Sequence, residues 1–331
     1  MHTLPRLWPL LGRRDTVTSS TGWIALLLCL ISTSTFNTFA KSLTGTLSPL
    51  SLIFISEILT LAFVGLSFGL WPVIHQLIRL ERKTLIPLVI MGCFSGVAGP
   101  YLWFRGLMET TAMSATFFSK VELIFMLILA STYIHEKVTR RHVMASLIIL
   151  FGVIVIALRG FTDGIHVQRG DLIIVASVLC YSLGSSIFRR HLSHIKPELA
   201  VFARSMTAIC AFFLASPFLQ HPFIEELQHF PRFLIPTLLS FALISRFLST
   251  FTFYEAIEHI PVSVVYPTLM LEVVGSALLA HMVLGETLAW YHVVGGAFVL
   301  LGNLRLHKLG VHDDDQHLEQ HAVERLAHRA S

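Results

Sequence analysis

The chain contains few charged residues. Only 13% of its 331 residues are Asp, Glu, Lys or Arg, about half of the roughly 25% that soluble domains carry. The hydrophobic share is 54% and the mean hydropathy is +0.71. A soluble fold of this length would leave much of that apolar surface in water. The composition therefore excludes a soluble protein and predicts an integral membrane protein.

The sequence also has few cysteines and no Walker A motif. Its four cysteines lie inside apolar runs without metal-ligand spacing, so we expect small buried side chains, no metal site and no cofactor. The missing G-x-x-x-x-G-K-[ST] segment excludes an ATP-driven pump built from this chain alone. No nucleophile–base pair or metal cluster is visible at a predicted membrane face, so we expect no enzyme and no catalytic residues.

The net charge of +4 does not indicate nucleic-acid binding. The basic residues lie in short loops between apolar runs, where the positive-inside rule places them. Residues 1–21 have too short an apolar part for a signal peptide and no small-residue cleavage site. We therefore predict the lipid bilayer as a partner, no nucleic acid, and a cytoplasmic lead-in over residues 1–21.

Ten apolar runs approach the roughly 20 residues that a membrane helix needs. They are continuous rather than alternating, so they predict helices and not a barrel. The predicted spans are about 22–41, 49–71, 85–106, 111–134, 142–158, 171–190, 198–219, 232–254, 261–284 and 290–306.

Lys and Arg concentrate in alternate loops, which predicts the orientation. The predicted inner segments include the groups Arg79–Arg82–Lys83, Lys137–Arg140–Arg141 and Arg189–Arg190–Lys196, whereas the outer loops hold only Lys41, Arg105, Arg159, Arg169 and Arg232. Both termini are therefore placed in the cytoplasm, and the expected location is the inner or plasma membrane.

One stretch occurs twice, as residues 122–152 and 272–302. A shift of 150 residues without a gap aligns four pairs, namely Glu122 with Glu272, Glu136 with Glu286, His142 with His292, and Gly152 with Gly302. A five-span unit that is duplicated must enter the membrane in opposite senses. The loop cations agree, because residues 285–292 lack the Lys and Arg of residues 135–142. We predict an all-α protein of ten spans in two inverted repeats, an arrangement typical of secondary transporters.

The repeat sets the expected domain boundaries. The first five-helix repeat covers residues 22–158, a glycine-containing linker covers 159–170, and the second repeat covers 171–306. A polar, histidine-rich cytoplasmic tail follows at 307–331. His317 and His321 lie one helical turn apart, which suits a shared metal ion, but without a third ligand we expect a solvated tail.

The repeated segment resembles the EamA-like, ten-helix branch of the drug/metabolite transporter superfamily. Each copy has a mid-helix Glu, an acidic turn fourteen residues later (HEKVT and GETLA), and a small-residue helix with a late Gly. The lead-ins 106–115 and 256–265, and Gly170-Asp171 at the sixth span, also fit. The resemblance implies a carrier of small metabolites, often an exporter, that works by alternating access.

Two features depart from the family pattern. Leu123 and Val273 stand where the family often has Pro after the mid-helix Glu. The first span has no acid, only Asn37 and Lys41, whereas the related small multidrug carriers use a Glu there. These departures weaken a proton-coupled multidrug mechanism.

Charges inside the spans cost about 2.5–3.5 kcal/mol each on insertion scales and are candidates for function. Glu122 and Glu272 are mates under the repeat; they either flank a substrate or hold the two halves in register. Lys120 has Met270 as its mate and either faces the site or pairs with an acid such as Glu57. Arg246 is expected to face a cavity or a partner acid.

Other candidates are aromatic or lie near helix ends. Tyr101 and Trp103 follow the break at Gly99-Pro100, and Tyr266 precedes Pro267. All three aromatics are candidates to line a pocket, with packing kinks and an interfacial Trp as the alternatives. Four further expectations are structural: Arg204 snorkels to the inner surface, the glycine pairs 65/69 and 92/96 pack helices, and Glu136 and Glu286 cap helix ends.

The sequence therefore predicts a secondary transporter, expected to export amino acids, related zwitterions or organic anions. The alternatives are a proton-coupled multidrug efflux carrier, a channel, or a non-transporting scaffold or receptor. The predicted partners are a small-molecule substrate and lipid, and a homodimer is left open.

Overall fold

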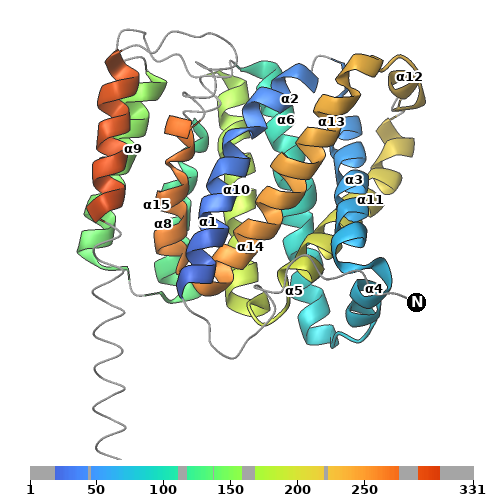
Figure 1. Cartoon of the computed structure of the whole chain (residues 1–331), viewed down its shortest axis with the longest axis horizontal. Coiled ribbons are helices and arrows are strands. Elements are labelled where there is room, and N and C mark those ends of the chain that lie inside the picture. The colour runs from blue at the N-terminus through green and yellow to red at the C-terminus, as the bar shows by residue number, and fades with distance from the viewer. Residues whose placement is uncertain are drawn as a thin grey trace, which may run out of the picture.

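The computed structural model describes residues 19–43, 46–110, 118–136, 138–158, 168–219, 223–275 and 290–305. These residues form helices that run roughly parallel to one another, and they contain no strand (Figure 1). The helices of the first half are α1 (Ser19–Ser34), α2 (Phe36–Leu43), α3 (Pro49–Phe68), α4 (Leu70–Ile78), α5 (Arg82–Gly92), α6 (Gly99–Glu109), α8 (Glu122–Leu129) and α9 (Arg140–Ala157).

The second half continues the pattern. Its helices are α10 (Arg169–Ile187), α11 (Pro197–Leu219), α12 (Phe223–Gln228), α13 (Ile235–Ser240), α14 (Ser249–His259), α15 (Val262–Leu269) and a last helix at 290–305. Short π-helical or 3₁₀ segments join several of them: η1 (Cys93–Ala98), η2 (Ala130–Ile134), η4 (Phe188–Leu192), η5 (Arg232–Leu234) and η6 (Phe241–Leu248).

The surface and the interior have the polarity of a membrane protein. Within the described ranges, five helical stretches are long and apolar enough to cross a bilayer, namely Pro49–Phe68, Arg82–Glu109, Arg169–Leu192, Pro197–Ser216 and Arg232–His259. Large apolar side chains such as Leu66 and Leu214 are exposed, while Glu57, Arg204 and Arg246 are buried. This distribution suits a lipid exterior.

The two copies of the repeat share the same local backbone. Both are interrupted by two non-helical residues directly before the glutamate, at 120–121 and at 270–271. In each copy an i→i−3 hydrogen bond spans the interruption: Leu123 N donates to Lys120 O over 3.1 Å, and Val273 N donates to Met270 O over 3.2 Å. The shift of 150 residues predicted from the sequence therefore also relates the helix interruptions of the two copies.

Helices of the two halves pair with each other along most of their length. α1 packs against α14, and α6 packs against α10. These two pairs are equivalent, because α1 corresponds to α10 and α6 corresponds to α14 under the repeat. α3 packs against α11 and α8 against α15, so each of these two pairs joins equivalent helices of the two halves (Figure 1). The two halves therefore interlock.

Glycines set several of these close approaches. A Cβ on Gly92 would lie 2.6 Å from Oγ1 of Thr207, and one on Gly96 would lie 2.9 Å from the Arg204 carbonyl oxygen. The predicted packing role of this pair is therefore confirmed. Gly65 also permits a close approach, because its Cβ would lie 2.7 Å from Cγ of Leu70 at the start of α4. For Gly69 the packing role is wrong: Gly69 has φ +81° and ends α3.

Gly170 and Asp171 hold the start of α10. A Cβ on Gly170 would come within 2.6 Å of the Glu109 carbonyl carbon at the end of α6. Asp171 is buried, accepts a 2.7 Å bond from Gln168 N in a capping box, and accepts another from the Thr110 hydroxyl. This motif docks α10 onto α6.

Candidate functional site

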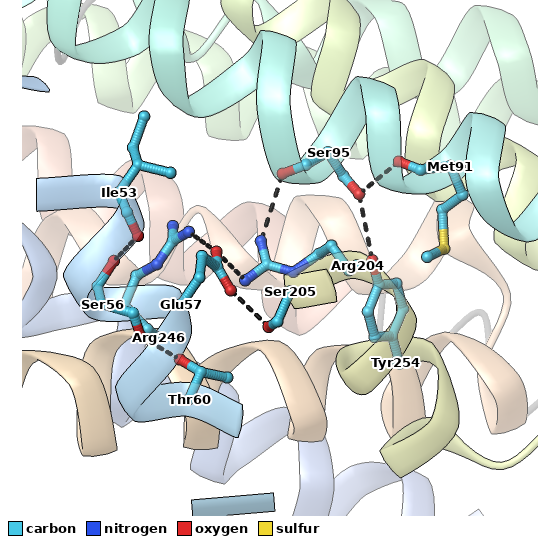
Figure 2. Close-up of polar contacts among 10 residues, drawn as sticks. All are labelled: Ile53, Ser56, Glu57, Thr60, Met91, Ser95, Arg204, Ser205, Arg246 and Tyr254. Atoms are coloured by element: carbon cyan, nitrogen blue, oxygen red, sulfur yellow. Dashed lines mark hydrogen bonds and ion pairs between the residues drawn. The ribbon is translucent and has the colours of Figure 1, made fainter. Parts of the chain in front are cut away.

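Glu57 on α3 lies at the centre of a buried ion cluster (Figure 2). Its Oε1 accepts from Nη2 of Arg204 on α11 over 2.8 Å and from Nη2 of Arg246 in η6. Its Oε2 accepts a 2.5 Å bond from the Ser205 hydroxyl. We call Glu57, Arg204 and Arg246 the arginine group; none of the three is more than 4% exposed.

Irregular backbone brings the arginine group together. Arg246 lies in the π-helical segment η6, and Ser95 lies in the corresponding segment η1 of the first half. Ser95 O accepts from Nη1 of Arg204 over 3.3 Å, and its hydroxyl lies 3.4 Å from the Tyr254 hydroxyl. Such π segments rotate the following residues and recur at functional sites. Here both of them contribute to one cluster.

A second ion pair joins the halves at the helix breaks. Nζ of Lys120, in the interruption before α8, lies 3.2 Å from Oε1 of Glu272. Lys120 is 6% exposed, whereas Glu122 and Glu272 are partly exposed. Glu122 is close enough to interact electrostatically with Lys120, Glu272 and Tyr266. We call Lys120, Glu122 and Glu272 the glutamate group.

Tyr181 on α10 is a link between the two groups. It is close enough to interact electrostatically with Arg246 and Arg204 of the arginine group and with Glu122 of the glutamate group. One turn further along, Ser185 Oγ accepts a 2.8 Å hydrogen bond from the Tyr266 hydroxyl. The arginine and glutamate groups therefore belong to one polar interior that contains charges of both signs.

The structure assembles five of the seven predicted site residues around this interior: Lys120, Glu122, Glu272, Arg246 and Tyr266. Tyr101 and Trp103 make no hydrogen bond or ion pair with the charged groups in the described part of the chain. Tyr101 is 39% exposed on α6, and Trp103 packs edge-on against Phe36, with ring centroids 6.5 Å apart. Their part in a site stays a prediction.

One expectation about the charged residues was wrong: Arg204 does not snorkel, because it is 3% exposed and paired with Glu57. For Lys120, the alternative of an acid as its partner is met by Glu272 and not by Glu57, whose carboxylate the two arginines occupy. The expectation of a partner acid for Arg246 is confirmed. Sequence reasoning also missed Tyr181, which carried no signal beyond being a lone tyrosine in an apolar run.

Glu136 forms a separate contact at one end of the bundle. Its Oε1 lies 3.2 Å from Nε of Arg189 and accepts from Val262 N over 3.2 Å, while its Oε2 accepts from N and Oγ of Ser263. Arg189 also donates to two carbonyls at the end of α14, those of Ile257 and Glu258. The predicted capping role of Glu136 is confirmed; Glu286 lies outside the described residues.

Replacement of Glu136 by Ala is expected to destabilise the protein by about 1–3 kcal/mol. The change removes the carboxylate that accepts from the first two backbone N–H groups of α15, and it leaves the partly buried Arg189 without its acid. Thermal unfolding of the purified protein measures it. Glu81→Ala is the matched control, because Glu81 precedes α5 without a capping side-chain bond. Equal melting temperatures for the two variants would contradict the assigned contact.

An all-helical chain with an apolar exterior and a charged interior shared by two repeats has the architecture of secondary transporters. The chain belongs to the EamA-like transporter family, whose model matches residues 20–158 and again residues 168–305. The two matches agree with the two copies found in the sequence, and the resemblance to this family is confirmed. The protein is therefore a multi-pass membrane protein of this family.

Two similar proteins extend the comparison. An "Uncharacterized transporter" of Methanothermobacter thermautotrophicus is 24% identical over 227 residues, which cover 68% of this chain and 65% of that protein. The chain thus spans just under two thirds of that curated relative. A crystal structure described only as that of a protein superposes with a TM-score of 0.69 at 16% identity, covering 88% of this chain and 98% of the other. That likeness supports the fold.

Proposed function

We propose that this protein is a secondary transporter of small charged metabolites, such as amino acids, related zwitterions or organic anions, and that it works by alternating access. Export is the proposed direction. The observation that carries the proposal is the Lys120–Glu272 ion pair, 3.2 Å long, which joins the two repeats where both helices are interrupted. Broken helices at the junction of two repeats are where transporter substrates bind.

The charges support a substrate with polar ends. Each charge inside a span costs about 2.5–3.5 kcal/mol on insertion scales. The six charges of the arginine and glutamate groups together therefore indicate a functional role. The carboxylates of Glu122 and Glu272 suit an amine, and the cations Lys120 and Arg246 suit a carboxylate. A zwitterion uses both.

The proposed membrane topology belongs to the same proposal. Ten spans in two inverted five-helix repeats, with both termini in the cytoplasm, put Glu136 and Arg189 together at the inner face. Their observed contact agrees with this, because it requires both residues to lie at the same end of the bundle. The proposed location is the inner or plasma membrane.

A proton-coupled multidrug carrier is the alternative within transport, and Glu122 is the residue that would carry the proton. A channel or a non-transporting scaffold would use the same fold. Counterflow separates these classes, since saturable exchange across a sealed membrane requires a carrier. Purified protein in liposomes should exchange a labelled metabolite from a panel of amino acids and organic anions.

The variants Lys120→Met, Glu122→Gln and Glu272→Gln are expected to lower the exchange rate at least tenfold while retaining the folded state. Each removes one charge next to the helix breaks. Glu109→Gln is the control, because Glu109 forms an exposed pair with Arg105 within α6. Wild-type exchange by all three folded variants would refute the proposed site, and a flux that does not saturate would identify a channel.

A further inference from the structure

The arginine group has an excess positive charge. Arg204 and Arg246 share a single carboxylate, and Glu57 also accepts from Ser205. Only Glu57 and the Tyr181 phenol act on Arg246 as negative or potentially negative partners in the described structure. Two cations and one anion leave the arginine group with one net positive charge, whereas the neighbouring glutamate group has one net negative charge. A buried net charge is costly unless an opposite charge lies close to it, so an anion in contact with the two arginines would stabilise the arginine group.

The arginines also have unused hydrogen-bond donors. Nε of Arg204 and Nε of Arg246 are both fully buried and have no partner. A guanidinium has five N–H donors in a planar fork, and this fork matches the two oxygens of a carboxylate. Of its donors, Arg204 directs Nη1 to Ser95 O and Nη2 to Glu57. Arg246 also interacts with the Tyr181 phenol, whereas neither Nε has an acceptor among the described residues.

We propose that the arginine group binds one monovalent anionic group, with the carboxylate of the transported metabolite as its occupant. Glu57 acts as the fixed counter-charge that limits the site to a single negative charge. A dianion would leave the site with one net negative charge. Tyr181, which interacts with both Arg246 and Glu122, places this anion site beside the glutamate group, where the other end of a zwitterion would lie.

This inference rests on the proposed function only for the identity of the occupant. The anion site itself is tested at equilibrium, without transport. The full-length protein, purified in lipid nanodiscs in sodium sulfate buffer, is unfolded thermally with increasing sodium acetate, sodium chloride or methylammonium sulfate. Acetate is expected to raise the melting temperature saturably, since a ligand that binds only the folded state stabilises it. Methylammonium sulfate should not.

Charge-count variants separate an anion site from a merely structural ion cluster. Arg204→Gln leaves one cation and one acid, and is expected to weaken the apparent acetate affinity at least tenfold. The double variant Glu57→Gln/Arg204→Gln returns the site to one net positive charge and should regain the acetate response. Arg105→Gln, which removes an exposed cation on α6, should respond like the wild type.

Several outcomes would overturn the proposal. One is an acetate response that is absent in the wild-type protein or unchanged in Arg204→Gln. Another is a double variant that folds but does not respond. Stabilisation by chloride alone, with no effect of acetate, would assign the site to an inorganic halide and reject the carboxylate. If acetate binds as expected but liposomes show no exchange, the proposed transport fails and the anion site stands.

Discussion

Replacement of Glu57 by Leu is expected to be among the most destabilising single substitutions in the described structure, by about 3–5 kcal/mol. The change leaves Arg204 and Arg246 buried without their shared carboxylate, and it removes the acceptor of the Ser205 hydroxyl. Removing one partner of a buried ion pair costs much more than the pair contributes, because the other charge stays desolvated. Loss of detergent-stable protein and a fall of several degrees in melting temperature should report it.

The matched control is Glu109→Leu on α6. It also removes one carboxylate from an arginine, but the Arg105–Glu109 pair is exposed and lies on a single helix. Such pairs contribute about 0.2–1 kcal/mol. Equal stability losses in the two variants would show that Glu57 does not neutralise a buried cluster.

Gly152→Ala is expected to cost about 1–3 kcal/mol although it adds a single methyl group. A Cβ at Gly152 would lie 2.5 Å from the Gly295 carbonyl oxygen and 2.8 Å from Cβ of Phe298, both on the helix at 290–305. Backbone cannot move aside as a flexible side chain can, so α9 and this helix would have to separate. Small residues permit such close helix packing in membranes.

Gly296→Ala tests the same helix without the clash. Among the described residues its Cβ would meet only Cγ2 of Val274, at an ordinary 3.7 Å. Alanine has the better helix propensity, by about 0.8–1.0 kcal/mol, so this variant should be neutral or more stable. Thermal unfolding of the two variants side by side decides the matter, and a Gly152→Ala protein as stable as Gly296→Ala would contradict the close approach.

The sequence predicted the helices and the repeat because both depend on local patterns. Hydropathy over about twenty residues marks a span whatever its neighbours are. The register of Glu122 on Glu272 survives in the structure as matching helix interruptions at 120–121 and 270–271. Five residues of the candidate site were found for a related reason, since a charge or a tyrosine inside an apolar run is conspicuous.

The partners of those charges could not be predicted in the same way. Depth along a helix suggested that Arg204 would reach the surface, but the direction of its side chain depends on how α11 meets α3. It also depends on Gly92 and Gly96, which let α5 and η1 approach α11 closely, and on the π-helical segments that contain Ser95 and Arg246. A π-helical turn leaves no mark in hydropathy. The ion pair between Glu57 and Arg204, which are 147 positions apart, can therefore be found only from the structure.

The pairing of helices across the two halves also determines when these contacts can form during synthesis of the chain. Arg204 comes 147 positions after Glu57, and Arg246 comes 189 positions after it. At roughly 5–20 residues per second, the wait for Arg204 lasts about 7–30 s. Until then α1 and α3 have been synthesised without their partners α14 and α11. The first repeat is thus an incomplete assembly until the second is inserted, and the insertion machinery or lipid has to shelter an acid that the finished protein hides completely.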